Sequence, residues 1–265
     1  MKKFFVIGNP IDHSLSPLLH NHWFKRNGIK ATYEKKLIKK ENEIIALIKE
    51  IREKKTTGVN VTVPLKNIIV PFLDYLTPEA EITQSVNTVV LEDKKVVGYN
   101  TDVAGFELAI RYSKYDVNGK KILIIGSGGV VPSIIFSLQK MKSRKIFIMN
   151  RTKTKAEKIK ELFNEVEIVE WGKELDVDMI INATSIGLKK EDKINIDFEL
   201  YGKNKFFYDV IYKPDETSFL KEARNLGSKT ENGKMMFIYQ AHQAFFIWNK
   251  ILPEINQDII ELVSG

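Results

Sequence analysis

The chain has 265 residues, 43% of them hydrophobic, which is enough to bury a sizeable core in one large or two modest domains. It has no cysteine, no apolar run of about 18 residues and no N-terminal apolar stretch long enough for a signal peptide; these features argue against disulfides, thiolate metal sites and a transmembrane helix, and favour a cytoplasmic location. The net charge of +7 suits a nucleic-acid binder or a protein that binds small anions and does not choose between the two, although the lysines are dispersed among acids. We expect no nucleic-acid partner and no membrane partner.

Strand-like and helix-like segments alternate at the start of the chain. The pattern predicts strands at 4–8, 31–38 and 58–63 and helices at 18–28 and about 41–54. Gly28 is predicted to stop the first helix, and Asn42 to cap the second. Such alternation is typical of a parallel sheet with crossover helices.

The stretch GVNVTVPLK (58–66) ends a core-like strand with a proline and a lysine. Proline cannot donate a ladder hydrogen bond, so Pro64 marks the point where the chain leaves the sheet. Asn60, Thr62 and Lys66 then lie at or near the strand's exit, where open α/β sheets bind ligands. A turn with a solvated lysine is the alternative that this segment alone favours.

The pattern continues with a short helix over 77–84 and two short strands joined by a charged turn over 86–102. A second series follows, with a helix over 103–113, strands at 121–126, 145–150, 179–184 and 205–211, and helices that end near 141 and 164. Two domains with a hinge near 100–118 are therefore predicted. The last 33 residues predict two helices with Pro253 between them.

The segment KILIIGSGGVVPS (121–133) predicts a strand, a glycine-rich turn and a helix. Gly126 permits the tight turn, and Gly128 and Gly129 let the backbone approach a pyrophosphate at the helix N-terminus. The third fingerprint position holds the bulky Val131, while Pro132 suits a first helical turn. A turn without a ligand is the alternative, but the flanking strand and helix favour a nucleotide site.

The next predicted strand indicates which nucleotide is bound. An NAD site would offer an acid to the ribose about 20 residues beyond the glycines, but this strand ends in NRTKTK (150–155). Arg151 can bind a 2′-phosphate with paired donors, Thr152 can donate a hydroxyl and Lys155 adds a second cation. NADP is therefore predicted rather than NAD.

Nine motifs then occur in one order along the chain: GNPIDHSLSP (8–17), NVTVPLK (60–66), SVNTVV (85–90), GYNTD (98–102), GSGG (126–129), NRT (150–152), NATS (182–185), YDVIYKP (208–214) and NGKMMFIYQ (232–240). Together they resemble the shikimate dehydrogenase family over nearly the whole chain. The resemblance implies NADPH-dependent reduction of 3-dehydroshikimate to shikimate, on the pathway to aromatic amino acids.

The same resemblance implies an α/β fold in which an N-terminal α/β substrate domain is joined to a Rossmann-like NADP-binding domain. The C-terminal helices are expected to pack back on the first domain. The substrate domain would then comprise residues 1–101 and 236–265, and the NADP-binding domain residues 102–235.

Site residues follow from the resemblance by position. Lys66 matches the catalytic lysine, and Ser14, Ser16 and Tyr212 match hydroxyls that hold the substrate carboxylate. The polar contacts to the ring hydroxyls and the reacting oxygen match Asn60, Thr62, Asn87, Asp102 and Gln240. The pyrophosphate segment matches Gly126, Ser127, Gly128, Gly129 and Val130, the 2′-phosphate segment matches Asn150, Arg151, Thr152 and Lys155, and the positions near the nicotinamide match Val210 and Gly233.

These residue types suit the reaction. Hydride addition to a ketone produces an alkoxide that must gain a proton, and Lys66 is the candidate acid/base with Asp102 beside it; which of the two moves the proton stays open. No metal is expected, because the cofactor carries the redox step and the HNH pair at 20 and 22 points to different helix faces.

Two alternatives remain from the sequence, a quinate/shikimate dehydrogenase that also accepts NAD and a catalytically idle nucleotide-sensing module. A nucleic-acid binder ranks third. The oligomeric state stays open, with a homodimer as one option.

Overall fold

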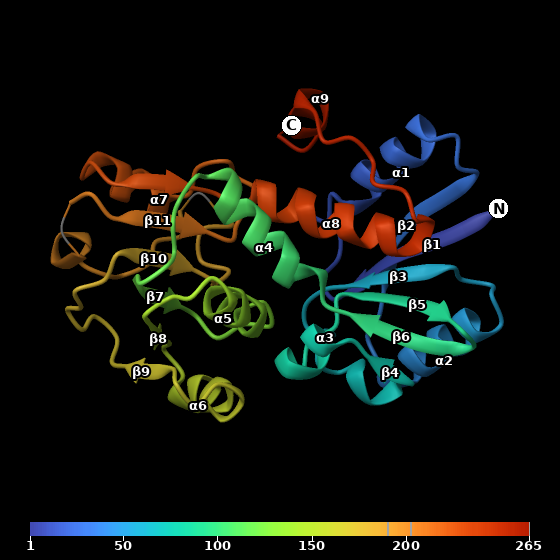
Figure 1. Ribbon diagram of the computed structural model, residues 1–265, viewed down its shortest axis with the longest axis horizontal. Coiled ribbons are helices and arrows are strands. Elements are labelled where there is room, and N and C mark those ends of the chain that lie inside the picture. The colour runs from blue at the N-terminus through green and yellow to red at the C-terminus, as the bar shows by residue number, and fades with distance from the viewer. Residues whose placement is uncertain (190, 202, 265) are drawn as a thin grey trace. The chain divides into compact units, whose positions relative to one another are not determined.

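The computed structural model describes residues 1–189, 191–201 and 203–264, which form two compact units (Figure 1). Unit 1 comprises Met1–Gly105 and Ile238–Gly265, and unit 2 comprises Phe106–Phe237. The boundaries predicted from the sequence, after residues 101 and 235, lie a few residues earlier. Which ligand each unit binds stays a prediction at this point.

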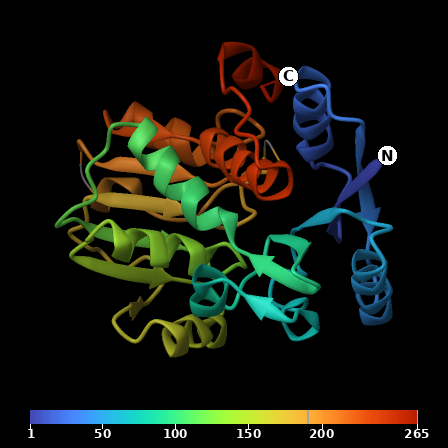
Figure 2. The same cartoon turned by 45° about the vertical axis from the view of Figure 1, so that its right-hand side comes forward.

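Unit 1 contains a six-stranded sheet in the order β2-β1-β3-β5-β6-β4 (Figure 1, Figure 2). The strands are β1 Lys2–Gly8, β2 Ala31–Leu37, β3 Gly58–Val61, β4 Tyr75–Leu76, β5 Thr88–Glu92 and β6 Lys95–Tyr99. The first three strands are parallel, as predicted. Strand β5, for which no direction was predicted, pairs antiparallel with both β3 and β6.

The antiparallel pairing has a local cause. Asp93 and Lys94 join β5 to β6, and both have positive φ angles, 46° and 65°. Two such residues form the tight turn whose twist matches a β-hairpin. The two strands and the charged turn predicted over 86–102 are thus confirmed, whereas the direction of the strands was not deduced from them.

The helices of unit 1 lie close to their predicted positions. They are α1 Ser16–Arg26, α2 Glu41–Arg52, α3 Pro78–Thr83 and α9 Gln257–Leu262, with a 3-10 turn at Val70–Phe72. Two further helices, α4 Thr101–Tyr112 and α8 Lys234–Asn249, contain the boundaries between the two units. Gly28 follows α1 with a φ of 64°, which confirms it as the stop. The prediction that Asn42 caps α2 is wrong, because the helix begins one residue earlier, at Glu41. The Glu43 carboxylate accepts hydrogen bonds from the backbone N–H groups of Lys39 and Lys40.

The C-terminal helices pack on the first unit, as predicted. The Trp248 ring of α8 lies 4.9 Å from the Phe4 ring of β1, and its indole N–H donates to the Val89 carbonyl at 3.2 Å. A Cβ on Gly58 would lie 2.4 Å from the Trp248 indole nitrogen. The glycine in β3 therefore provides the space in which α8 packs.

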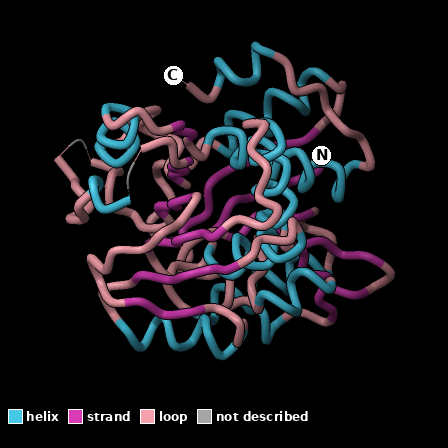
Figure 3. The backbone as a smooth tube through the Cα atoms, turned by 60° about the vertical axis from the view of Figure 1, so that its left-hand side comes forward, coloured by secondary structure: helices cyan, strands magenta, loops and turns pink. Residues whose placement is uncertain are grey.

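Unit 2 contains six parallel strands in the order β12-β11-β10-β7-β8-β9, which Figure 3 shows in magenta among cyan helices. The strands are β7 Lys121–Ile125, β8 Lys145–Met149, β9 Glu167–Val169, β10 Met179–Asn182, β11 Phe206–Asp209 and β12 Lys229–Glu231, and the helices are α5 Val131–Lys140, α6 Lys153–Leu162 and α7 Ser218–Asn225, with a 3-10 turn at Phe198–Tyr201. This is the doubly wound order of dinucleotide-binding folds. In the described residues of both units, no helix is long and apolar enough to span a membrane.

Candidate active site

The predicted catalytic pair is formed within unit 1. The chain leaves the sheet after β3, where the Thr62 N–H still donates to the Ile7 carbonyl at 2.9 Å. In the loop that follows, the Lys66 ammonium forms an ion pair with the Asp102 carboxylate. The two side chains are 11% and 8% exposed, so water screens the pair only weakly. The structure therefore brings together the two residues on which the predicted chemistry depends.

Asp102 lies in the first turn of α4. A carboxylate there is favoured by the partial positive charge of the helix N-terminus. Its second oxygen accepts a hydrogen bond from the Asn87 amide at 3.0 Å, and its backbone N–H donates to Asn100 Oδ1 at 3.1 Å. One carboxylate oxygen is therefore held by Lys66 and the other by Asn87.

Asn87 is the link between several elements around this pair. It is 2% exposed, and its Oδ1 accepts the Thr101 N–H at 2.7 Å. Its amide nitrogen also lies 3.5 Å from Gln240 Oε1, on the part of α8 that belongs to unit 1. The four predicted residues Lys66, Asn87, Asp102 and Gln240 thus form one cluster.

Asn60 makes its hydrogen bonds to protein groups. Its Oδ1 accepts the Tyr33 hydroxyl at 2.6 Å, and its amide donates to the Asn87 carbonyl at 3.0 Å and to Thr88 Oγ1 at 2.9 Å. Both amide hydrogens are thereby used, although Asn60 was predicted to contact substrate. The sequence did not single out Tyr33 or Thr88 at all.

The two predicted serines lie at the start of α1. The Ser16 N–H donates to Ser14 Oγ at 3.3 Å, and Ser16 is buried. Thr62 is half-buried directly after β3. All the predicted substrate contacts except Tyr212 therefore belong to unit 1.

Unit 2 contains the predicted glycine turn between β7 and α5. Gly126 has a φ of 112°, and a Cβ there would lie 2.8 Å from the Ala183 carbonyl oxygen. A glycine is required at this position on both counts. The bulky Val131 is fully buried at the first residue of α5, and Pro132 occupies the first turn as predicted. The turn and the N-terminus of α5 fit a pyrophosphate.

The predicted 2′-phosphate segment follows β8. Arg151, Thr152 and Lys155 are exposed at the start of α6, whose first turn carries no acid. The Asn150 amide donates to the Thr152 carbonyl at 2.7 Å and shapes the turn before the helix. The positive end of the helix dipole and the cations at the same end favour an anion there.

The two positions predicted near the nicotinamide are backbone neighbours in unit 2. A Cβ on Gly233 would lie 2.1 Å from the Val210 carbonyl oxygen, so this contact requires a glycine. Close by in sequence, the Tyr212 ring stacks on the Phe237 ring at 4.5 Å. Val210 and Tyr212, which make these contacts, directly follow the end of β11.

Asp209, at the end of β11, is a polar residue to which the sequence assigned no role. It accepts hydrogen bonds from Thr217 Oγ1 at 2.7 Å, Asn182 Nδ2 at 3.0 Å and the Ile211 N–H at 3.0 Å. Burial raises the pKa of Asp209 to about 6. An acid at the end of a predicted buried strand was a signal that could have identified it.

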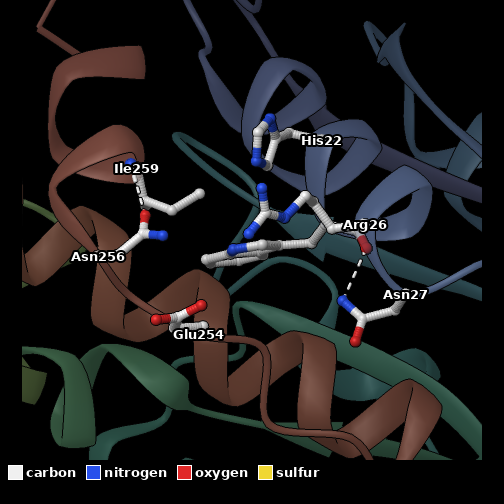
Figure 4. A pocket seen from close by; sticks show the side chains of 7 residues that line it. His22, Arg26, Asn27, Glu254, Asn256 and Ile259 are labelled. Atoms are coloured by element: carbon white, nitrogen blue, oxygen red, sulfur yellow. Dashed lines mark hydrogen bonds between the residues drawn. The ribbon is translucent and has the colours of Figure 1, made fainter.

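A separate pocket of about 180 Å³ lies in unit 1 (Figure 4). His22 and Arg26 of α1 line one side, and Glu254 and Asn256, which precede α9, line the other. None of the predicted site residues belongs to it. Among the residues that the structure describes, no group of three histidine or acidic side chains could hold a metal ion.

The fold and the two sets of residues define a class of protein. Unit 2 has the strand order and glycine turn of a dinucleotide-binding fold, and unit 1 holds a buried lysine–aspartate pair surrounded by amides and hydroxyls. This combination is that of a nucleotide-dependent oxidoreductase that acts on a polar small molecule.

Comparisons with known proteins identify the family. The model of the shikimate dehydrogenase substrate binding domain matches residues 6–89, and that of shikimate / quinate 5-dehydrogenase matches residues 107–189. The shikimate dehydrogenase (NADP(+)) of Pelagibacter ubique is 56% identical over 99% of each chain. The chain belongs to the shikimate dehydrogenase family, which confirms the resemblance seen in the sequence.

Solved structures agree with this assignment. A shikimate dehydrogenase from Aquifex aeolicus is 37% identical with a TM-score of 0.90, covering 99% of this chain and 97% of that one. A shikimate 5-dehydrogenase from Thermus thermophilus, solved in complex with NADP(H) and shikimate, is 31% identical with a TM-score of 0.89, covering 99% and 98%. The predicted fold class is therefore confirmed.

Proposed function

We propose that this protein catalyses the reversible NADPH-dependent reduction of 3-dehydroshikimate to shikimate. The observation that carries the proposal is the buried ion pair of Lys66 and Asp102, in a chain that belongs to the shikimate dehydrogenase family. Reduction of a ketone needs a hydride at carbon and a proton at oxygen. When bound, NADPH supplies the hydride.

In this proposal, Lys66 provides the proton. Its ammonium donates to the oxygen that becomes a hydroxyl, and in the reverse direction the amine takes the proton back. Asp102 orients the ammonium and accepts a hydrogen bond from a substrate hydroxyl. A general acid placed in this way contributes on the order of 10²- to 10⁴-fold to the rate.

The arrangement of the polar groups supports a polyhydroxylated acid as substrate. Ser14, Ser16 and Tyr212 would bind the carboxylate, while Thr62, Asn87 and Gln240 would bind ring hydroxyls. A site built to hydrogen-bond hydroxyls rejects analogues that lack them, because its buried polar groups would be left unpaired. Asn60 would act through its neighbours, because both of its amide hydrogens already have protein acceptors.

The residues of unit 2 fit NADP. The backbone of Gly126, Ser127, Gly128, Gly129 and Val130, with the N-terminus of α5, would hold the pyrophosphate. Arg151, Thr152 and Lys155 would hold the 2′-phosphate, with Asn150 shaping their turn. Val210 and Gly233 would lie beside the nicotinamide.

The two alternatives, a quinate/shikimate dehydrogenase that accepts NAD and a catalytically idle nucleotide-sensing module, are less well supported. The relatives bear the name of NADP-dependent shikimate dehydrogenases, which does not favour a quinate enzyme, and retention of the ion pair does not favour an idle module. A cytoplasmic location, suggested by the absence of cysteine, and a homodimer stay predictions.

One assay tests the proposal. Purified protein is mixed with 3-dehydroshikimate and either NADPH or NADH, and the absorbance of the reduced nicotinamide is followed. We expect rapid loss of absorbance with NADPH and a rate at least about tenfold lower with NADH, because the 2′-phosphate contacts are lost. No oxidation with either cofactor would favour the idle module, and faster turnover of quinate than of shikimate in the reverse direction would favour the quinate enzyme.

A further inference from the structure

A continuous chain of buried hydrogen bonds runs through unit 1 to the catalytic carboxylate. It begins at Tyr33 on β2, whose hydroxyl donates to Asn60 Oδ1 on β3 at 2.6 Å. The Asn60 amide donates to Thr88 Oγ1 on β5 at 2.9 Å. This series of hydrogen bonds therefore connects the strands β2, β3 and β5 of the sheet.

The second half of this series of hydrogen bonds reaches the ion pair of Lys66 and Asp102. The Thr88 hydroxyl donates to Asn87 Oδ1 at 3.1 Å, and the Asn87 amide donates to Asp102 Oδ1 at 3.0 Å. The other oxygen of Asp102 contacts Lys66. Every link from Tyr33 to Asp102 is a side-chain hydrogen bond between residues that, taken as whole residues, are at most 6% exposed.

Tyr33 is fixed at the far end of the chain. Its ring stacks on the His20 ring at 4.4 Å with an interplanar angle of 1°, and the side chain is 1% exposed. Burial raises the pKa of Tyr33 well above its ordinary value, so the hydroxyl keeps its hydrogen and remains a donor to Asn60. The orientation of the Asn60 amide follows, because its oxygen must face Tyr33.

Thr88 is held in an equally defined way. It is fully buried, its oxygen accepts from Asn60, and its single hydrogen has two acceptors within reach, Asn87 Oδ1 at 3.1 Å and Thr101 Oγ1 at 3.4 Å. A buried polar network favours arrangements in which every donor and acceptor is paired, and the shorter distance favours the bond from Thr88 to Asn87. Asn87 Oδ1 thus accepts from Thr88 and from the Thr101 N–H at 2.7 Å, which leaves the Asn87 amide nitrogen to face Asp102 and Thr101 Oγ1.

We propose that Tyr33 and Thr88 are positioning residues for the reaction, which act through Asn60 and Asn87 to hold the Asp102 carboxylate against Lys66. The inference rests on the proposed function, since it concerns the same catalytic pair. Neither residue is placed to act on substrate itself. Their effect is to fix the geometry in which Lys66 delivers its proton.

The test uses single-atom changes. Tyr33→Phe removes the hydroxyl and keeps the ring stacked on His20, and Thr88→Val replaces the hydroxyl by a methyl group. Thr88→Ser restores the hydroxyl and serves as the rescue variant. Tyr201→Phe is the matched control, because the Tyr201 hydroxyl is buried in unit 2 with no hydrogen-bond partner among the described residues.

We expect kcat in Thr88→Val to fall about tenfold, the factor that about 1.4 kcal/mol represents for a buried group left unpaired. Tyr33→Phe should lower kcat by at least about threefold, and the double variant should be no slower than Thr88→Val alone, because both changes break one chain. KM for NADPH should not change in any variant. Thr88→Ser and Tyr201→Phe should stay within about twofold of wild type.

A merely structural role would lower the melting temperature and the amount of folded enzyme but leave kcat per folded enzyme unchanged. A kcat within about threefold of wild type in Thr88→Val, or losses that multiply in the double variant, would therefore overturn the inference. Should Thr88→Val fail to fold, Tyr33→Phe and its kcat decide the question. Wild-type protein without activity toward 3-dehydroshikimate would instead overturn the proposed function, and the inference with it.

Discussion

Lys66 and Asp102 place a cation and an anion side by side where little water reaches them, with side chains 11% and 8% exposed. Attraction between such charges is strong, but each depends on the other, because a buried charge without its partner costs about 3–5 kcal/mol. The loop after β3 and the first turn of α4 are thus coupled by a single ion pair. The chemistry proposed for this pair can be tested by removing one charge.

Lys66→Met keeps an unbranched side chain that reaches as far as the Lys66 Cε and removes the ammonium. We expect kcat to fall by about 10²- to 10⁴-fold, because no group is left to supply the proton. NADPH affinity, measured by fluorescence titration, should stay close to that of wild type, since the predicted cofactor residues lie in unit 2. Lys39→Met, at an exposed position of unit 1, is the control. Turnover within threefold of wild type would refute the assigned role.

Arg151 is the residue on which cofactor choice is predicted to depend. Arg151→Ala should raise KM for NADPH about tenfold or more, because a charge-assisted bond to the 2′-phosphate is lost, while KM for NADH should change little. Lys158→Ala removes another exposed cation from α6 and should leave both values unchanged. Equal weakening of both cofactors would show that Arg151 contacts no 2′-phosphate.

Among individual residues, the sequence identified those that would take part in the reaction but not those that hold them in place. Lys66 and Asp102 stand in motifs with a recognisable order, and they do meet. Tyr33, Thr88 and Asp209 escaped notice because their role depends on which strands are neighbours. Tyr33 and Thr88 lie on β2 and β5, and both are hydrogen-bonded to Asn60 of β3.

Among the helices and strands, long periodic segments were predicted well and the shortest ones were missed. The strands β9 and β12 have three residues each, and β4 has two, which is too short for a pattern of alternation. The antiparallel direction of β5 was missed because apolar strands have the same pattern in both directions. Helix α7 was missed as well, although Thr217 caps it by accepting the Leu220 N–H.

The turn that joins β7 to α5 gives a prediction about an element. In Gly126→Ala the new Cβ would lie 2.8 Å from the Ala183 carbonyl oxygen at a φ of 112°. We expect loss of about 2 kcal/mol or more of unfolding free energy and NADPH binding at least about tenfold weaker, because the backbone must shift where the pyrophosphate is expected. Chemical denaturation and NADPH titration measure the two effects.

Gly119→Ala separates steric overlap from backbone strain. Gly119 also has a positive φ, 72°, but a Cβ there would meet nothing within 4 Å. This variant should lose only about 1 kcal/mol, the cost of a left-handed residue, and should bind NADPH normally. Equal effects of the two substitutions would mean that the contact with Ala183 is unimportant.

Unit 1 is assembled from both ends of the chain. The C-terminal part of α8 completes an aromatic cluster around His20, which includes Trp23, Phe24, Tyr33, Phe245 and Trp248. The sequence predicted that these helices pack on the first unit, but a histidine at the centre of the cluster could not be foreseen. Its environment depends on residues more than 200 positions apart.

His20 links this cluster to the pH dependence of folding. It is fully buried, and neither ring nitrogen has a hydrogen-bond partner among the described residues. Burial lowers the pKa of His20 from 6.5 to about 3, so the folded protein keeps the ring neutral. In the unfolded chain the His20 ring has its ordinary pKa of 6.5, so it binds a proton when the pH falls below 6.5. The stability contributed by the neutral ring is therefore fully present above pH 6.5 and is lost as the pH falls from 6.5 toward 3.

His20→Phe should remove this dependence. Between pH 7 and pH 5 the wild-type protein should lose about 2 kcal/mol of unfolding free energy that the variant does not lose, since only the unfolded wild-type chain gains a proton on His20. Urea unfolding at both pH values, followed by tryptophan fluorescence, measures the difference. Other groups that titrate in this range, including Asp209 with its raised pKa, are common to both proteins and cancel. An equal loss in both proteins would mean that the ring accepts a proton in the folded state, and that the centre of the aromatic cluster is accessible to water.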